Sequence, residues 1–156
     1  MPLFIGVKGE LYFPSLKAAG VTKADWIEIT ADKSGDVVIA DKAKLPAHDG
    51  TVWLFGHGNS DGKKGSIFHT FDEKTHKGFV FDNAKLYSFL SDTVGAKRLY
   101  IFACYQGKYL KQYMKGIKGL EFASGFDSAA NRSSAGTFIK GFLKSPGDYK
   151  MDKVEP

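Results

Sequence analysis

The sequence predicts an α/β fold, a three-layer αβα sandwich on a mostly parallel central sheet with one or two β-hairpins. Three short runs, 51–55, 99–103 and 120–123, are apolar apart from Thr51 and Glu121, which is typical of strands buried on both faces. Helical patterns separate these runs along the chain. Such alternation favours a parallel sheet with helices on both sides.

The first fifty residues predict a strand, a short helix and a hairpin. Residues 3–7 form a short apolar strand, and residues 14–19 form one or two helical turns that Gly20 closes. The apolar stretches 26–30 and 36–40 flank the turn sequence Asp-Lys-Ser-Gly. This arrangement predicts a β-hairpin.

The later part of the chain predicts a second hairpin, 66–71 with 77–81, and three helices. The first helix begins after Asp82, a residue type that caps helix N-termini. The second begins at about residue 108, and the third spans 133–143. The side chains expected to face the core are Leu86, Phe89, Leu90 and Val94, then Leu110, Met114 and Ile117, and finally Phe138, Ile139 and Phe142.

The chain length of 156 residues favours one domain. We assign it to residues 1–144, and the charged stretch 145–156, with its proline and glycine, to a C-terminal tail. Hydrophobic residues make up 43% and charged residues 25%, which is normal for a globular protein and argues against disorder.

The single cysteine, Cys104, excludes an intrachain disulfide and every zinc site that needs two thiolates. His48, His69 and His76 follow no ligand spacing and are expected at the surface. We therefore expect neither a metal nor an organic cofactor.

The net charge of +5 is modest, and the lysines are spread along the chain. This indicates a solvated basic surface and argues against nucleic acid as the main partner. No apolar run approaches the roughly 20 residues of a membrane span. The first lysine follows a very short apolar run, which does not fit a signal peptide. We expect a cytoplasmic protein, with non-classical export left open.

The carboxyl ends of parallel strands are where ligand sites form in such sheets. His57 follows the apolar run 51–55, and Cys104 follows the run 99–103, with one crossover helix between them. A right-handed crossover places two such strands side by side or nearly so. A thiol and an imidazole would then converge from separate elements, as nucleophilic catalysis requires. The backbone N–H groups of Gly58 and Cys104 are candidates for stabilising an oxyanion, and a helix after Cys104 would favour its thiolate.

Two stretches resemble the histidine and nucleophile strands of the caspase-like cysteine peptidases. They are 53–58 (Trp-Leu-Phe-Gly-His-Gly) and 101–107 (Ile-Phe-Ala-Cys-Tyr-Gln-Gly). That group includes caspases, metacaspases, gingipain and CHAT-type domains. Residues 120–124 and 134–138 resemble the next strand and helix, so the resemblance covers about residues 51–143.

The resemblance implies an endopeptidase that hydrolyses peptide bonds through a thioester and needs no cofactor. Cys104 would be the nucleophile and His57 the general acid or base, with the oxyanion held by the N–H groups of Gly58 and Cys104. Asp127 would contribute to the substrate pocket and favour lysine or arginine at P1. The substrate would be a protein or peptide.

Three other interpretations stay open. The same fold would also serve as a catalytically inactive binding or regulatory module. The stretch 58–62 has the G-x-S-x-G pattern of serine hydrolases, although no helix pattern follows the serine as that motif needs. A basic nucleic-acid-binding domain would use the lysines that share one helix face, Lys108, Lys111, Lys115 and Lys118. Tyr105, Tyr109 and Tyr113 share another face of that helix and are expected in core or interface packing.

Overall fold

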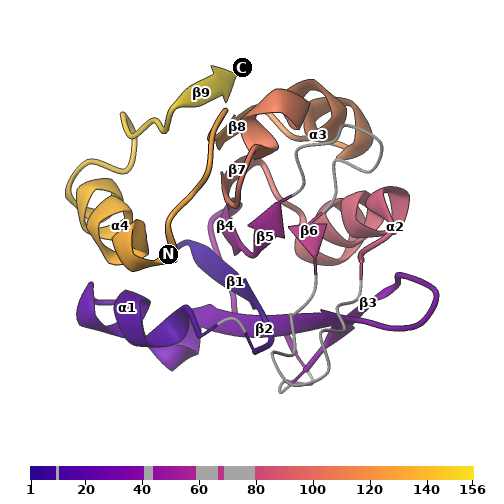
Figure 1. Cartoon of the computed structure of the whole chain (residues 1–156), viewed down its shortest axis with the longest axis horizontal. Coiled ribbons are helices and arrows are strands. Elements are labelled where there is room, and N and C mark those ends of the chain that lie inside the picture. The colour runs from indigo at the N-terminus through magenta and orange to yellow at the C-terminus, as the bar shows by residue number, and fades with distance from the viewer. Residues whose placement is uncertain (10, 41–43, 59–66, 69–79) are drawn as a thin grey trace.

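The structure is a computed structural model that describes residues 1–9, 11–40, 44–58 and 80–156, and the backbone of residues 67 and 68. Its main element is a seven-stranded mixed sheet in the order β3-β2-β1-β4-β7-β8-β9 (Figure 1). These strands are β1 (Leu3–Val7), β2 (Trp26–Ala31), β3 (Val37–Ile39), β4 (Thr51–Phe55), β7 (Arg98–Phe102), β8 (Phe122–Gly125) and β9 (Lys153–Glu155). The inner strands pair in parallel, whereas β3 and β9 pair antiparallel at the two edges.

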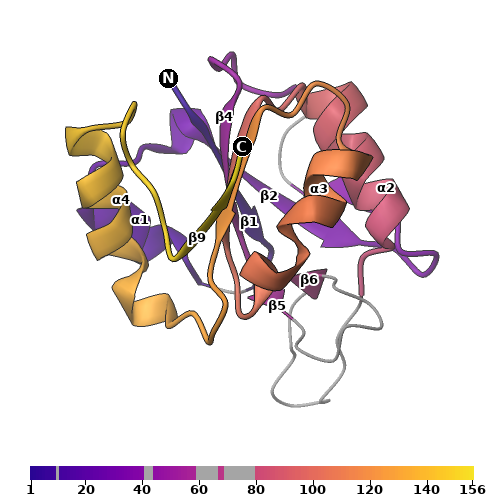
Figure 2. The ribbon, with the colours of Figure 1, turned by 90° about the horizontal axis from the view of Figure 1, so that it is seen from above.

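Helices cover both faces of this sheet. The α-helices are α1 (Phe13–Ala18), α2 (Asn83–Ser88), α3 (Leu110–Gly116) and α4 (Ala135–Lys144). Single-turn 3₁₀ helices are η1 (Lys23–Asp25), η3 (Gln106–Tyr109) and η4 (Arg132–Ser134), and a π-helical stretch, η2 (Phe89–Val94), extends α2. Figure 2 shows α1 and α4 on one side of the sheet and α2 and α3 on the other. The predicted α/β class with a mostly parallel sheet is confirmed.

The two faces of the sheet carry different side chains. Within β1, β4 and β7, aromatic and aliphatic residues alternate along each strand, so each kind falls on its own side. We call the side under α1 and α4 the aromatic face; its strand residues include Phe4, Trp53, Phe55, Tyr100 and Phe102. We call the side under α2 and α3 the aliphatic face; its strand residues include Ile5, Val52, Leu54, Leu99 and Ile101.

The crossover helix between β4 and β7 begins where the sequence predicts. The Asp82 side chain accepts a hydrogen bond from the Lys85 backbone N–H at 3.0 Å, which satisfies one free donor of the first turn. The predicted inward residues Leu86, Phe89, Leu90 and Val94 are all buried.

One of the two predicted hairpins is confirmed. Strands β2 and β3 pair antiparallel, and the Asp32 carboxylate accepts hydrogen bonds from the backbone N–H groups of Ser34 and Asp36 in the turn. The second predicted hairpin, 66–71 with 77–81, lies largely outside the described residues. Of that region, β6 (Ile67–Phe68) pairs antiparallel with β5 (His57–Gly58).

Three predicted boundaries shift by a few residues. Strand β8 begins at Phe122, two residues later than expected, because Gly119 (φ 80°) is still in the turn that leads to it. The α-helix expected from residue 108 begins at Leu110, after the 3₁₀ turn η3. In the same way, the 3₁₀ turn η4 precedes α4.

The C-terminal residues, assigned to a tail by their composition, take part in the sheet. Strand β9 pairs antiparallel with β8, and the Met151 N–H donates to the buried Ser124 hydroxyl at 2.9 Å. The Tyr149 ring lies against those of Trp53 and Tyr100. The proline and glycine serve the turn after α4, and the apolar side chains beyond them return to the core.

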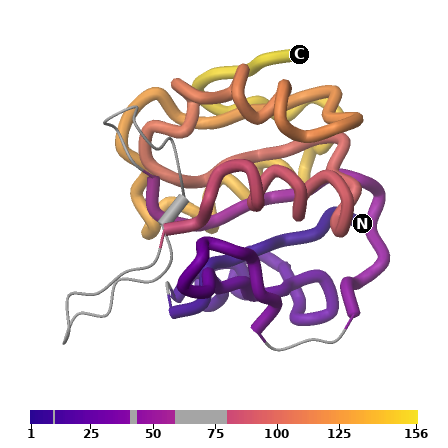
Figure 3. Tube along the Cα trace, turned by 90° about the vertical axis from the view of Figure 1, so that its right-hand side faces the viewer, coloured from indigo at the N-terminus to yellow at the C-terminus, as the bar shows by residue number. Residues whose placement is uncertain are grey.

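The order of the strands creates a switch point in the sheet. The chain places β2 and β3 on one side of β1, and β4, β7, β8 and β9 on the other. Figure 3 shows the result, with the purple segment that contains β2 and β3 at one end of the molecule and the C-terminus at the other. Ligands of open α/β sheets bind beyond the strand ends at such a point, which here lies between β1 and β4.

Candidate functional site

His57 and Cys104 lie at the same level beyond two paired strands. Strands β4 and β7 are parallel neighbours, and Phe55 is the register partner of Phe102. His57 and Cys104 each follow two residues after these partners. The Gly56 N–H also donates to the Phe102 carbonyl at 3.3 Å, which carries the pairing one residue further. The two strands are therefore adjacent, as the sequence predicts.

Gly58 lies directly against the main chain of Cys104. A Cβ atom built on Gly58 would come within 1.8 Å of the Cys104 carbonyl oxygen and 2.8 Å of its carbonyl carbon. Real Cβ atoms never approach backbone so closely, so the contact requires glycine at this position. The neighbouring His57 side chain is exposed.

The sulfur of Cys104 contacts the loop between β8 and α4. The Ala130 N–H donates to Sγ at 3.3 Å, and the thiol points to the Ala130 carbonyl at 3.5 Å. Cys104 as a whole is half-buried. These two contacts fix the position of the sulfur against the Ala130 main chain.

The turn that follows, residues 104–107, is held against the same loop. Tyr105 has a φ of 62°, a left-handed conformation that costs a non-glycine residue of order 1–3 kcal/mol and occurs often at functional sites. Its N–H donates to the Ser128 carbonyl at 2.9 Å, and the Gly107 N–H donates to the Phe126 carbonyl at 2.7 Å. These two bonds stabilise the strained turn.

A buried amide lies beneath this turn. Gln106 is fully buried, and its Nε2 donates to the Cys104 carbonyl at 3.4 Å. Its Oε1 accepts a hydrogen bond from the Tyr113 hydroxyl at 2.6 Å. Burial raises the pKa of Tyr113 well above its usual value, so this hydroxyl stays protonated and remains a donor. The sequence analysis did not single out Gln106, although a polar residue inside an otherwise apolar pattern was the available signal.

A cavity of about 470 Å³ lies along the loop between β8 and α4. Its walls include Phe126, Ala130 and Phe138 from the β8–α4 region, and Lys150, Met151 and Asp152 from the C-terminal segment. Ala130, whose N–H donates to the Cys104 sulfur, is also one of the lining residues, whereas Cys104 is not. The volume suffices for one large amino-acid side chain.

Asp127, the predicted pocket carboxylate, is exposed next to this cavity. Its Oδ1 lies 3.9 Å from the Lys153 Nζ, and its N–H donates to the Asp152 Oδ2 at 3.2 Å. Asp152 lines the cavity itself. The structure thus places two carboxylates close to the cavity, one of them already paired with a lysine.

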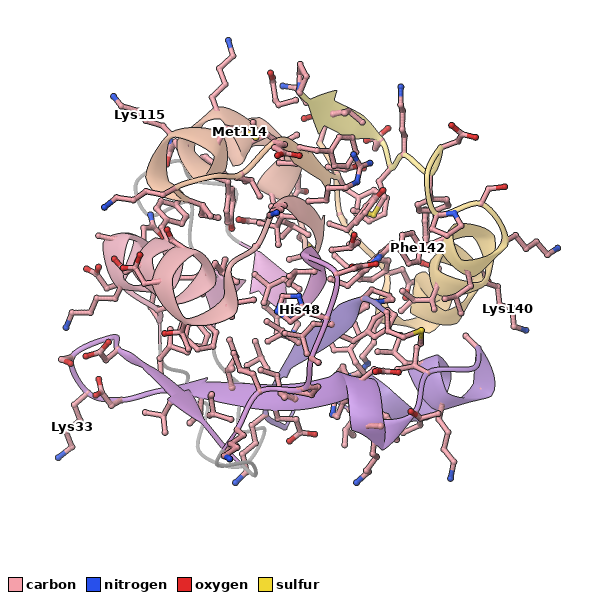
Figure 4. All side chains as sticks on the ribbon, turned by 180° about the vertical axis from the view of Figure 1, so that it is seen from behind. Lys33, His48, Met114, Lys115, Lys140 and Phe142 are labelled. Atoms are coloured by element: carbon pink, nitrogen blue, oxygen red, sulfur yellow. The ribbon has the colours of Figure 1, made fainter. Side chains whose placement is uncertain are left out.

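The lysines of the predicted basic face are all exposed on η3, α3 and the turn after it. Figure 4 shows Lys115 pointing away from the body of the molecule, whereas Phe142 of α4 is directed inward. Lys108 lies over the Tyr105 ring at 5.1 Å. Of the tyrosines expected in packing, Tyr109 and Tyr113 are buried.

The remaining histidines and the serine motif do not contribute a described site. His48 is half-buried before β4, where its Nδ1 accepts a hydrogen bond from the Gly50 N–H (Figure 4). His69, His76 and positions 59–62 of the G-x-S-x-G stretch lie outside the described residues. In the described part of the chain, no three His, Cys, Asp or Glu side chains gather as metal ligands would.

None of the helices in the described ranges has the length and hydropathy that a membrane span requires. The comparison with protein-family models gave no family that matches the chain. Neither the curated proteins nor the solved structures gave a match. The proposed function therefore rests on the geometry around Cys104.

Proposed function

We propose that the protein is a cysteine endopeptidase of the caspase-like type, built as a three-layer αβα sandwich, with Cys104 as nucleophile and His57 as general acid and base. One observation carries the proposal. His57 and Cys104 stand equally far beyond the register partners Phe55 and Phe102, and Gly58 packs on the Cys104 main chain. Thiol catalysis requires an imidazole and a thiol that converge from separate elements, and this register of the two strands supports that arrangement.

In this mechanism His57 takes the proton of the Cys104 thiol, and the resulting thiolate attacks the carbonyl carbon of a peptide bond. A carbon–sulfur bond forms, and the carbonyl oxygen becomes an oxyanion that the N–H groups of Gly58 and Cys104 stabilise. His57 then protonates the leaving amine as the carbon–nitrogen bond breaks. Water, deprotonated by His57, attacks the thioester; as the carbon–sulfur bond breaks, His57 returns that proton to the sulfur, which releases the carboxylic acid and the free thiol. The protein's own groups suffice for every step.

The cavity lined by Ala130, the residue that bonds the Cys104 sulfur, would take the side chain on the acyl side of the cleaved bond. Its aromatic walls suit the aliphatic stem of lysine or arginine, and a carboxylate would meet the charged end. Asp127 already faces Lys153, whereas Asp152 lines the cavity. We therefore expect Asp152→Asn to lower kcat/KM for peptides with basic P1 residues by about tenfold or more, and Asp127→Asn to lower it less.

The proposal is tested by alkylation of Cys104 and by proteolysis. Iodoacetamide should alkylate the wild-type thiol faster than that of His57→Ala, because the imidazole assists loss of the thiol proton. His48→Ala is the matched control, since His48 lies before the opposite end of the same strand and should leave the rate unchanged. Cleavage of casein or of quenched peptides should vanish in Cys104→Ser.

Cleavage that persists in Cys104→Ser would overturn the mechanism. If wild-type protein cleaves no peptide and alkylation does not depend on His57, the fold serves as a binding or regulatory module instead. Retention on a heparin column that Lys111→Glu/Lys115→Glu abolishes would point to the nucleic-acid interpretation.

A further inference from the structure

The Gln106–Tyr113 pair contacts the main chain of Cys104 from within the core. Gln106 is fully buried, and its amide nitrogen lies 3.4 Å from the Cys104 carbonyl oxygen. Burying a carboxamide is unfavourable unless its polar atoms find partners. Both ends of this amide have one, because Tyr113 donates to the other end at 2.6 Å.

The position of Tyr113 is in turn fixed by packing. The side chain comes from α3, is fully buried and meets the Tyr87 ring of α2 edge to face at 5.1 Å. Polar groups that are buried and satisfied in this way specify one arrangement of their surroundings. The chain of contacts therefore runs from the rigid helices α2 and α3 through Tyr113 and Gln106 to the Cys104 carbonyl.

The Cys104 carbonyl is also the atom against which Gly58 packs. A change in its orientation would rotate the peptide unit and displace the Cys104 Cα, the thiol and the neighbouring N–H together. The left-handed φ of Tyr105 makes the turn strained, so it depends on such outside contacts to keep its shape.

We propose that Gln106 and Tyr113 are positioning residues that hold Cys104 in its reactive orientation. This inference rests on the proposed function of Cys104 as a nucleophile. Neither residue has to touch the substrate. Misplacement of a reacting group by about 1 Å can lower a rate by about a hundredfold, so loss of the pair should be visible in the rate of the chemical step.

The structure offers a matched control for this test. Tyr87 and Tyr113 pack against each other, yet within the described residues the buried Tyr87 hydroxyl has no hydrogen-bond partner. Tyr113→Phe therefore removes the hydrogen bond to Gln106, whereas Tyr87→Phe removes a hydroxyl that bonds to nothing described. The two variants lose the same atom from the same ring cluster.

The test measures the alkylation rate of Cys104 across pH, and kcat and KM for a cleaved peptide, at a temperature where circular dichroism shows each variant fully folded. Tyr113→Phe is expected to lower kcat and the alkylation rate about tenfold, with little change in KM, and to shift the pH profile of alkylation. Tyr87→Phe should match wild type. Gln106→Met should resemble Tyr113→Phe, and the double variant should be no slower than Gln106→Met alone.

Equal alkylation rates and pH profiles in Tyr113→Phe, Tyr87→Phe and wild type would overturn the inference. A purely structural role would lower the melting temperature but leave the rate per folded molecule unchanged, which would also overturn it. The alkylation arm needs no substrate, so it decides the role of the pair even if proteolysis is never found. Failure of the peptidase proposal itself would be seen separately, as equal rates of Cys104 alkylation in the wild type and in His57→Ala.

Discussion

The two faces of the sheet are built from different side chains and support the site in different ways. On the aromatic face, rings meet rings: Trp53 stacks on Tyr100 at 4.6 Å and meets Phe142 edge to face at 5.2 Å. On the aliphatic face, branched side chains such as Leu54 and Ile101 pack under α2 and α3. The aromatic face gains directional ring contacts in addition to burial.

Both faces reach the carboxyl ends of β4 and β7, by different routes. From the aromatic face, the Tyr12 hydroxyl donates to the Gly56 carbonyl at 3.3 Å, next to His57. From the aliphatic face, Tyr113 reaches the Cys104 turn through Gln106. On each face, the ring of a tyrosine is buried in the core, and its hydroxyl group makes a hydrogen bond near the carboxyl ends of β4 and β7.

The largest expected effect breaks the aromatic face. Trp53→Ala should lower the free energy of unfolding by about 3–5 kcal/mol, because it leaves a cavity and removes several ring contacts. Leu54→Ala, at the next position on the opposite face, should cost about 2–5 kcal/mol and fall below Trp53→Ala. Urea unfolding of both variants measures the difference.

A milder substitution separates burial from the indole nitrogen. Among the described residues, the buried Trp53 Nε1 has no hydrogen-bond partner. Trp53→Phe should therefore cost much less than Trp53→Ala, since it keeps a ring and removes an unpaired polar atom. If Leu54→Ala proves costlier than Trp53→Ala, the aromatic face is not the more strongly packed one.

The next effect concerns the point where the two strand ends meet. Gly58→Ala would place a methyl group on the Cys104 carbonyl, so β5 has to move away. We expect a stability loss of about 1–3 kcal/mol, as for other overpacked sites, and alkylation of Cys104 that no longer depends on His57. Thermal unfolding and alkylation rates, each with and without His57→Ala, check this.

The control is Gly147→Ala, because a Cβ there has no atom within 4 Å and the residue is exposed. Its stability should stay within about 0.5 kcal/mol of wild type. A Gly58→Ala variant with wild-type stability and unchanged alkylation would show that β5 and the Cys104 turn are not in contact in solution.

The local patterns of the sequence predicted most of the fold. The apolar runs, the Asp82 cap and the Asp-Lys-Ser-Gly turn are short-range features, and the structure confirms the parallel neighbours β4 and β7. Rings and aliphatic residues alternate inside these runs, and that alternation indicates two distinct faces of the sheet. The faces were missed because the sequence analysis treated all apolar residues as one class. The strand β9 was missed because the proline, glycine and charged residues of 145–156 indicate a tail by composition, and composition does not report pairing with β8.

The site was predictable in part for the same reason. His57 and Cys104 follow strand ends, so the rule for parallel sheets brings them to one edge. Gln106, Ala130 and Asp152 escaped because their roles depend on tertiary contacts: a buried hydrogen bond, a backbone contact to sulfur and a cavity wall. No spacing along the chain encodes these contacts.

The smallest expected effect is a loss of stability at alkaline pH, to which the buried tyrosines of the two faces contribute separately. Burial raises the pKa of Tyr87 to about 12, and burial, followed by the nearby Tyr87, raises the pKa of Tyr113 well above its usual value; both belong to the aliphatic face. The unfolded chain ionises its tyrosines near pH 10, so above that pH it binds fewer protons than the folded chain. The contribution of these two tyrosines to the free energy of unfolding should be constant below pH 10. Above pH 10 it should fall by about 1.4 kcal/mol per pH unit for each tyrosine.

Urea unfolding between pH 8 and 11 measures this slope. Tyr113→Phe and Tyr87→Phe should each reduce the slope of the free energy of unfolding against pH above pH 10 by about 1.4 kcal/mol per pH unit, since phenylalanine does not ionise. On the aromatic face, where burial raises the pKa of the half-buried Tyr149 to about 12, Tyr149→Phe is the counterpart. If Tyr113→Phe leaves the slope unchanged while Tyr149→Phe flattens it, the Tyr113 hydroxyl is not held neutral by burial, and the donor to Gln106 on which the Cys104 turn depends is absent.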